Sequence, residues 1–349
     1  MNYLEWISNC TKTEWWHDSG NPDEIRLALD RGATGVTTNP VLTYRSFQSQ
    51  PEFWKPKVLA LGDDFEPAER AEALLKLVAT YAAEQVRPIY ERTHGRLGYA
   101  LGQLNPALAD DAEGMLAMSR RVHSWAPNIA VKLPATASGI EVITHLAEEG
   151  IPICATINVS VAQALAVAEA YECGRRRAIH KGVQPPLCIV VQQVGRLDDY
   201  LRDVAGDMKL GLPESVITMA GLAVAKRTYE MFEERSYDAV IMPAGLRGVY
   251  HLTEMAGGRL IYTINTRVQD MILEADPPQE ERIHNPIPQE TLEQLLRIPE
   301  FVRAYEPDGM KPSEFITYGV TQKLLSQFME TGWAPLETYL SSKVSTRWI

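Results

Sequence analysis

The sequence of 349 residues has little of what marks several classes of protein. It contains only four cysteines, which are dispersed without a CxxC pair, and its seven histidines do not cluster. A disulfide framework or a zinc site needs such residues at close, regular spacing. We therefore expect reduced thiols, and neither a metal ion nor another cofactor.

Long apolar runs and an excess of positive charge are also missing. No run approaches the roughly 20 apolar residues that span a bilayer, and the N-terminus lacks a basic segment followed by an apolar stretch. The formal net charge of −11 disfavours binding to nucleic acid or to an anionic membrane. We expect a cytoplasmic protein whose partners are small molecules, with any anionic substrate held by a few local arginines. The oligomeric state stays open, with a homodimer as one option.

What is present is an alternation of short β-rich runs with longer stretches of helical period, the pattern of a parallel sheet with crossover helices. We predict eight strands, at residues 13–17, 35–38, 97–104, 129–133, 151–157, 187–194, 239–242 and 260–264. Eight strands are typical of a (β/α)8 TIM barrel, which takes roughly 250 residues. After residue 275 a segment rich in proline and charge leads into helical patterns without another strand. The sequence therefore predicts a barrel over residues 1–275 and a helical C-terminal extension over residues 276–349, packed on the barrel.

Several crossover helices have clear boundaries in the sequence. Asn21 is a good cap residue before Pro22 and two acidic residues, and the periodic stretch stops at Gly32. The helical patterns over residues 138–149 and 160–173 are each followed by a glycine, Gly150 and Gly174. We predict that these glycines end their helices.

Catalytic groups of a TIM barrel lie at the C-terminal ends of its strands. The polar residues expected at those ends are Asp18, Thr37, Thr38, Asn39, Gln103, Asn105, Lys132, Thr156, Gln192, Gln193, Arg196 and Arg247. In a barrel these side chains converge on one mouth.

Lys132 stands out because it interrupts the apolar strand IAVKLP, where burying a lysine is costly. Burial and neighbouring arginines favour the neutral amine, which is the form that attacks a carbonyl. The alternative is a structural lysine at the strand edge, paired with an acidic residue. The local pattern favours both interpretations equally.

The other candidates also have structural alternatives. Asp18 is a candidate general base, but the segment DSGNP equally suits a turn. Arg196 and Arg247 at one mouth would suit a phosphate. In the alternative, Arg196 pairs with Asp198 or Asp199, and Arg247 opens a helix.

Taken together, these segments resemble the transaldolases. The resemblance covers nearly the whole chain and is carried by DSGNPDEI, GATGVTTNPVL, VKLPAT, the G-I-P-I-x-x-T-x-x-x-S run, VGRLDD and AGLRG. It implies a TIM barrel enzyme of the transferase type, in which Lys132 forms a Schiff base with a ketose and a dihydroxyacetone unit passes to an aldehyde acceptor. The expected substrates are sugars or sugar phosphates.

The resemblance also implies roles for individual residues. Lys132 is the Schiff-base lysine and Asp18 the acid/base group. Thr37, Thr38 and Asn39 belong to the donor site, Thr156 holds a catalytic water, and Arg196 and Arg247 bind phosphate.

The chain departs from the transaldolase pattern at several of these positions. Gln103 replaces a glutamate that works with the catalytic water, as in the related fructose-6-phosphate aldolases, and Cys154 replaces an asparagine of the donor site. Val191 and Gly245 replace serines near the phosphate, and Gln193 replaces an aromatic residue over the site. Two other functions stay open: a class I aldolase that releases free dihydroxyacetone, and a barrel that binds sugar phosphates without catalysis. A metal-dependent aldolase is disfavoured because the histidine set of such a site is missing.

Overall fold

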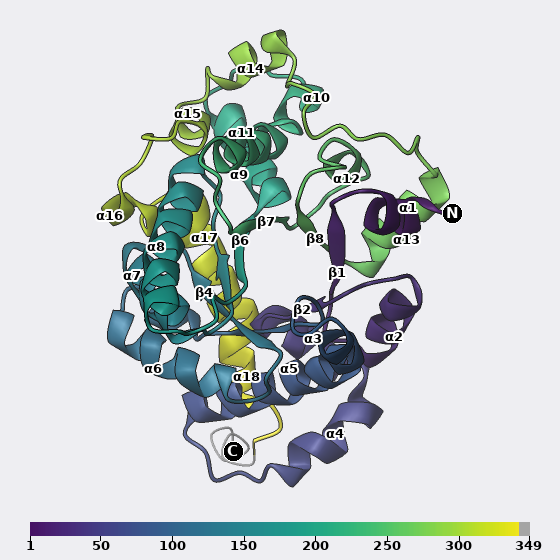
Figure 1. Cartoon of the computed structure of the whole chain (residues 1–349), viewed down its shortest axis with the longest axis vertical. Coiled ribbons are helices and arrows are strands. Elements are labelled where there is room, and N and C mark those ends of the chain that lie inside the picture. The colour runs from purple at the N-terminus through teal and green to yellow at the C-terminus, as the bar shows by residue number, and fades with distance from the viewer. Residues whose placement is uncertain (342–349) are drawn as a thin grey trace.

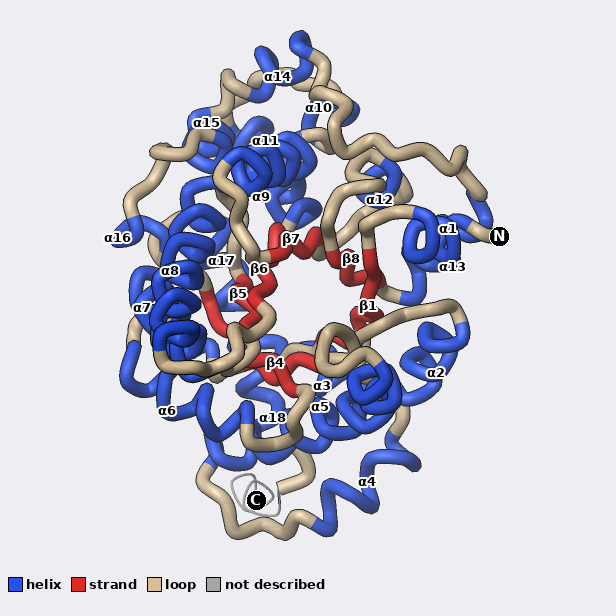
Figure 2. The backbone as a smooth tube through the Cα atoms, viewed as in Figure 1, coloured by secondary structure: helices blue, strands red, loops and turns tan. Residues whose placement is uncertain are grey.

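A computed structural model, which describes residues 1–341, contains a ring of eight parallel strands (Figure 2). The strands are β1 (Glu14–Asp18), β2 (Val36–Thr37), β3 (Ala100–Gln103), β4 (Ile129–Pro134), β5 (Ile153–Thr156), β6 (Cys188–Gln192), β7 (Val240–Pro243) and β8 (Ile261–Ile264). Their hydrogen-bonded order is β7-β6-β5-β4-β3-β2-β1-β8, and a bridge between Ile241 and Leu260 closes the ring. All eight predicted strands and the predicted (β/α)8 barrel are confirmed.

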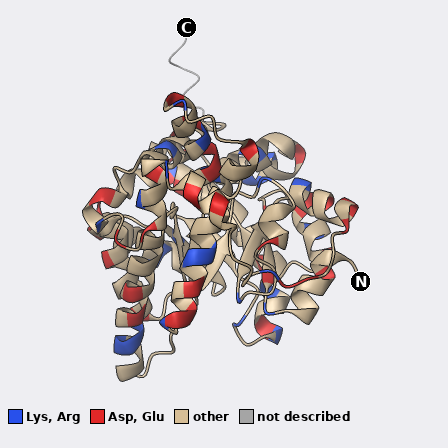
Figure 3. Cartoon of the chain, turned by 90° about the horizontal axis from the view of Figure 1, so that it is seen from above, with Lys and Arg blue, Asp and Glu red and all other residues tan. Residues whose placement is uncertain are grey.

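Helices surround the strands (Figure 1). The helices before and between the strands are α1 (Tyr3–Cys10), α2 (Pro22–Asp30), α3 (Pro40–Ser49), α4 (Pro51–Ala60), α5 (Pro67–Arg92), η1 (Pro106–Leu108), α6 (Ala112–His123), α7 (Ala137–Glu149), α8 (Val161–His180), α9 (Val194–Asp207), α10 (Glu214–Ile217), α11 (Ala220–Glu234) and α12 (Tyr250–Thr253). Acidic and basic residues are interspersed along them (Figure 3). None of the helices in the described part of the chain has the length and apolar character needed to cross a membrane.

The helix starts follow local capping chemistry, but one predicted helix end is wrong. Asn21 accepts hydrogen bonds from two backbone N–H groups of α2, and Gly150 ends α7 with φ at 77°. Gly174, in contrast, lies inside α8, which continues to His180. A Cβ atom at Gly174 would lie 2.2 Å from the carbonyl oxygen of Thr144 on α7. This glycine therefore allows two helices to pack closely and does not end one.

Alternate side chains of each strand point into the ring or out against the helices. The inward cluster consists of Trp16, Tyr99, Leu101, Ala130, Cys154, Ile189, Val191, Met242, Ala244 and Ile261. Lys132 follows Ala130 by two residues and therefore shares its inward direction. The core of the barrel thus places Lys132 near the C-terminal end of the ring.

The chain after β8 is helical, as predicted. It contains α13 (Thr266–Ala275), α14 (Gln289–Leu295), α15 (Pro299–Tyr305), α16 (Pro312–Phe315), α17 (Gly319–Phe328), the π-helical turn η2 (Met329–Trp333) and α18 (Ala334–Thr338). The last elements return to the barrel, where η2 packs on α3 and α18 packs on α5 (Figure 1). Residues 342–349 of the predicted extension lie outside the described residues, and the domain boundary at residue 275 stays a prediction.

Candidate active site

A small cavity lies at the C-terminal ends of the strands and encloses about 70 Å³. It is lined by Asp18, Thr37, Asn39, Lys132, Val191, Gln193, Arg196, Met242, Ala244, Gly245, Thr263 and Phe328. A larger cavity of about 1010 Å³ lies at the opposite end of the ring and contains none of the predicted site residues. Because catalytic groups of TIM barrels gather at the C-terminal end, we take the smaller cavity as the candidate active site.

Lys132 is buried on β4, with 6% of its surface exposed. Its register partners on the neighbouring strands are Gln103 and Cys154. Its amine donates a weak hydrogen bond to the carbonyl oxygen of Thr38 at 3.4 Å. Within residues 1–341 it forms no ion pair with an acidic side chain, so the structural alternative of a paired lysine is not observed.

Asp18 is the last residue of β1 and lines the same cavity. One carboxylate oxygen accepts a hydrogen bond from the Thr37 hydroxyl at 2.6 Å, and Thr37 in turn contacts the hydroxyl of Thr263 at 2.5 Å. These contacts hold the carboxylate at the strand end. A carboxylate fixed beside a cavity that also holds a buried lysine can exchange protons with a molecule bound there.

Thr38 and Asn39 mainly shape the loop that follows β2. The Thr38 hydroxyl donates to the carbonyl oxygen of Leu101 at 2.6 Å, and the Asn39 side chain caps α3 by accepting from the backbone N–H of Leu42 at 2.9 Å. Asn39 lines the cavity, whereas Thr38 does not.

Gln103 and Thr156 are buried and do not line the cavity, but each has an unpaired oxygen. Neither Gln103 Oε1 nor Thr156 Oγ1 has a hydrogen-bond partner in the described structure, and the same holds for both amide atoms of Asn158. Between Thr156 and Asn158, Ile157 has a φ of 55°, a strained value for a β-branched residue. Buried polar atoms left unpaired by the protein are normally completed by water or a ligand. Gln103 and Thr156 therefore suit a bound water.

Cys154 lies in the interior of the barrel, beside Lys132 and away from the cavity. Cys154 is fully buried in the inward cluster and does not line the cavity. Burial raises the pKa of its thiol to about 12, and Lys132 partly opposes this shift. The thiol is thus a neutral, apolar part of the barrel interior.

Arg196 lines the cavity, whereas Arg247 does not. Burial lowers the pKa of Arg196, and the charge of Arg247 lowers it further. The guanidinium of Arg247 donates to Asp199 Oδ2 from Nη2 at 2.6 Å and from Nε at 3.1 Å. Neither Asp198 nor Asp199 pairs with Arg196, whose guanidinium forms no hydrogen bond or ion pair within residues 1–341. Of the two arginines, Arg196 is therefore the one whose guanidinium lines the cavity unpaired within the described residues.

Some residues of the cavity were not predicted as site residues. Thr263 lies on β8. The alternation of inward and outward side chains along that strand is the signal that could have indicated it. Phe328 comes from the end of α17 in the extension, and no sequence signal indicates where that helix returns. In residues 1–341, no three His, Cys, Asp or Glu side chains gather in a way that could hold a metal ion.

Comparison with known proteins identifies the family. The family model described as Transaldolase/Fructose-6-phosphate aldolase matches residues 15–310. A transaldolase of Thiobacillus denitrificans is 25% identical over 341 residues, covering 92% of each chain. Transaldolases of Thermobifida fusca and Neisseria gonorrhoeae are 30% and 26% identical over 259 and 213 residues, covering 66% and 60% of this chain and 65% and 59% of theirs. Since the family model matches most of the sequence, the resemblance is confirmed, and the chain belongs to the transaldolase/fructose-6-phosphate aldolase family.

Proposed function

We propose that the chain is a transaldolase-type enzyme that transfers a dihydroxyacetone unit from a ketose or ketose phosphate to an aldehyde through a Schiff base on Lys132. One observation carries the proposal: a buried lysine without an acidic partner shares a cavity with a fixed carboxylate, Asp18. A buried amine that is not held in an ion pair is suited, in its neutral form, to nucleophilic attack on a carbonyl.

The first half of the reaction forms the Schiff base. The amine of Lys132 adds to the ketone carbon, and the resulting carbinolamine loses its hydroxyl group as water. The protons for this loss pass through a water held by Thr156 and Gln103, whose side-chain oxygens have no hydrogen-bond partner among the described residues. A glutamine orients such a water but does not accept a proton at neutral pH.

The second half breaks the carbon–carbon bond. Asp18 removes the proton from the hydroxyl group one carbon beyond the breaking bond, and the electrons of that bond flow into the iminium. An aldehyde leaves, and an enamine stays on Lys132. Addition of the enamine to a new aldehyde, followed by hydrolysis, completes the transfer.

A class I aldolase is the second candidate. In that reaction the enamine is protonated and hydrolysed, which releases free dihydroxyacetone. Gln103 favours this alternative, because transaldolases carry a glutamate at this position and fructose-6-phosphate aldolases carry a glutamine. A barrel that only binds sugar phosphates is the third possibility, and the absence of any covalent adduct would favour it.

Borohydride reduction tests the assigned nucleophile. The protein is treated with borohydride and fructose 6-phosphate or fructose, and the adduct is located by intact mass and peptide mapping. We expect an adduct on Lys132 in the wild-type chain and none in Lys132→Met. Lys226 is a suitable control because it is also buried, donating to the carbonyl oxygens of Arg282 and Asn285, so Lys226→Arg should keep the adduct. An adduct or turnover that survives Lys132→Met would refute the proposal.

Product analysis separates the two reactions. Free dihydroxyacetone without an added aldehyde indicates an aldolase. Product formed only when an acceptor aldehyde is present indicates transfer.

A further inference from the structure

We infer that Asp199 is a built-in counter-anion of Arg247, which weakens phosphate binding at the cavity and lowers the preference for phosphorylated over unphosphorylated ketoses. The inference rests on the proposed function, because it names the substrate class for that same site. It makes Asp199 a specificity-determining residue that does not itself touch the reacting atoms.

The contacts of Asp199 occupy both of its carboxylate oxygens. Oδ2 accepts from Arg247 as described, and Oδ1 accepts from Arg202 Nη1 at 3.0 Å. Partial burial would raise the pKa of Asp199, but the hydrogen bonds from Arg247 and Arg202 outweigh it and lower the pKa. The carboxylate is therefore ionised at neutral pH and neutralises Arg247, while Arg202 is also paired with Glu214 at 2.6 Å.

Arg247 lies close to the cavity even though it does not line it. A Cβ atom on Gly195, the residue before Arg196, would lie 2.2 Å from the carbonyl oxygen of Gly245 and 2.7 Å from Cγ of Arg247. The first turn of α9 thus packs closely against the loop after β7, and the charge of Arg247 lowers the pKa of Arg196. An anion bound at Arg196 therefore competes with Asp199 for Arg247, because one guanidinium binds carboxylate and phosphate in the same way.

The backbone of Arg247 is held without help from Asp199. Its N–H donates to Nδ1 of His251 at 3.0 Å, and Nε2 of His251 is 3.0 Å from Asp198 Oδ2. Asp198 Oδ1 also accepts from the backbone N–H of Gly221 at 2.7 Å, and both His251 and Asp198 are fully buried. Removing the charge of Asp199 therefore leaves the loop anchored and frees the guanidinium of Arg247 for a ligand.

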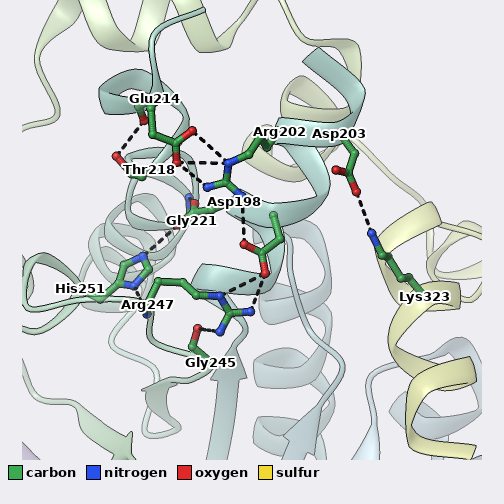
Figure 4. A network of polar contacts seen from close by, with 11 residues as sticks. Asp198, Arg202, Asp203, Glu214, Thr218, Gly221, Gly245, Arg247, His251 and Lys323 are labelled. Atoms are coloured by element: carbon green, nitrogen blue, oxygen red, sulfur yellow. Dashed lines mark hydrogen bonds and ion pairs between the residues drawn. The ribbon is translucent and has the colours of Figure 1, made fainter. Parts of the chain in front are cut away.

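The test is Asp199→Asn in the full chain. Binding of inorganic phosphate is measured by calorimetry, and kcat/KM is measured with fructose 6-phosphate and with fructose. Asp203→Asn is the matched control, because Asp203 lies on the same helix and pairs with the exposed Lys323 at 2.8 Å (Figure 4). We expect Asp199→Asn to tighten phosphate binding about tenfold, the effect of roughly one charge-assisted hydrogen bond, and to raise the ratio of the two kcat/KM values similarly. Asp203→Asn should change neither.

Other outcomes overturn the inference. Unchanged phosphate binding would mean that Asp199 and the ligand do not compete. Weaker binding in Asp199→Asn would make Asp199 a residue that positions Arg247 for phosphate, and no measurable binding in either protein would remove the anion site. Phosphate binding is measured without turnover, so the expected tightening in a chain that forms no adduct on Lys132 would refute the proposed function and leave this inference standing.

Discussion

Acid should destabilise this barrel through His17, which precedes Asp18 on β1. The His17 ring is fully buried on the outer side of the strand. Its Nδ1 lies 2.9 Å from the Nε2 of Gln269, an amide donor, which fits a neutral ring with its proton on Nε2. Nε2 itself has no hydrogen-bond partner in the described part of the chain. Protonation would therefore place a charge on a buried ring, with only the partly exposed carboxylate of Glu24, 3.9 Å from Nε2, to oppose it.

The size of the effect follows from the pKa. Burial lowers the pKa of His17 from 6.5 to about 4. In the unfolded chain the ring takes up a proton near pH 6.5, whereas in the folded chain it resists protonation until about pH 4. The contribution of the neutral His17 ring to the free energy of unfolding is thus complete above pH 6.5, and it is lost as the pH falls toward 4. The free energy of unfolding should fall by about 2 kcal/mol by pH 5 and by about 3 kcal/mol by pH 4 from this residue alone.

Urea unfolding near pH 7.5 and near pH 5 measures this loss. His17→Asn keeps an acceptor near Nδ1 and removes the titrating group, so its loss between the two pH values should be smaller than that of the wild type by about 2 kcal/mol. The exposed His94 provides the control, because His94→Asn should retain the full wild-type loss. Equal losses in wild type and His17→Asn would refute the assignment of acid sensitivity to His17.

Two further predictions concern the extension over the active site. Phe328→Ala should widen the cavity that Phe328 lines and cost about 3 kcal/mol of stability. We expect it to raise kcat/KM for a longer acceptor aldehyde relative to kcat/KM for a shorter one. An unchanged ratio would show that Phe328 does not limit the size of the acceptor. Gly332→Ala should lower the urea midpoint, because its Cβ would lie 2.7 Å from the backbone nitrogen of Val41, and this clash costs about 1–3 kcal/mol. Gly206→Ala, whose Cβ meets nothing within 4 Å, should be neutral or stabilising, and equal midpoints for the two variants would contradict the packing argument.

Much of the fold could be predicted from the sequence because it depends on local chemistry. The β-rich runs, the Asn21 cap of α2 and the left-handed Gly150 each depend on neighbouring residues, so the strands and most helix limits follow from short segments. Lys132 and Asp18 could be singled out for the same reason, since a charged residue at the end of an apolar strand is visible in a few letters. Gly174 misled because the same residue type serves to end a helix or to let another helix approach, and the local sequence does not distinguish them.

The order of strands and the polar residues at their ends were determined by the sequence alone, since they follow from periodicity and turn chemistry within a few residues. Only the tertiary structure decided which arginine stays free. Arg247 binds Asp199, 48 residues away, and leaves Arg196 unpaired at the cavity. It also decided that Phe328, from a helix late in the chain, lines a cavity shared with residues from the first strands. Such pairings depend on how distant elements are placed relative to one another, and that placement is set by packing of the whole barrel and not by any local segment.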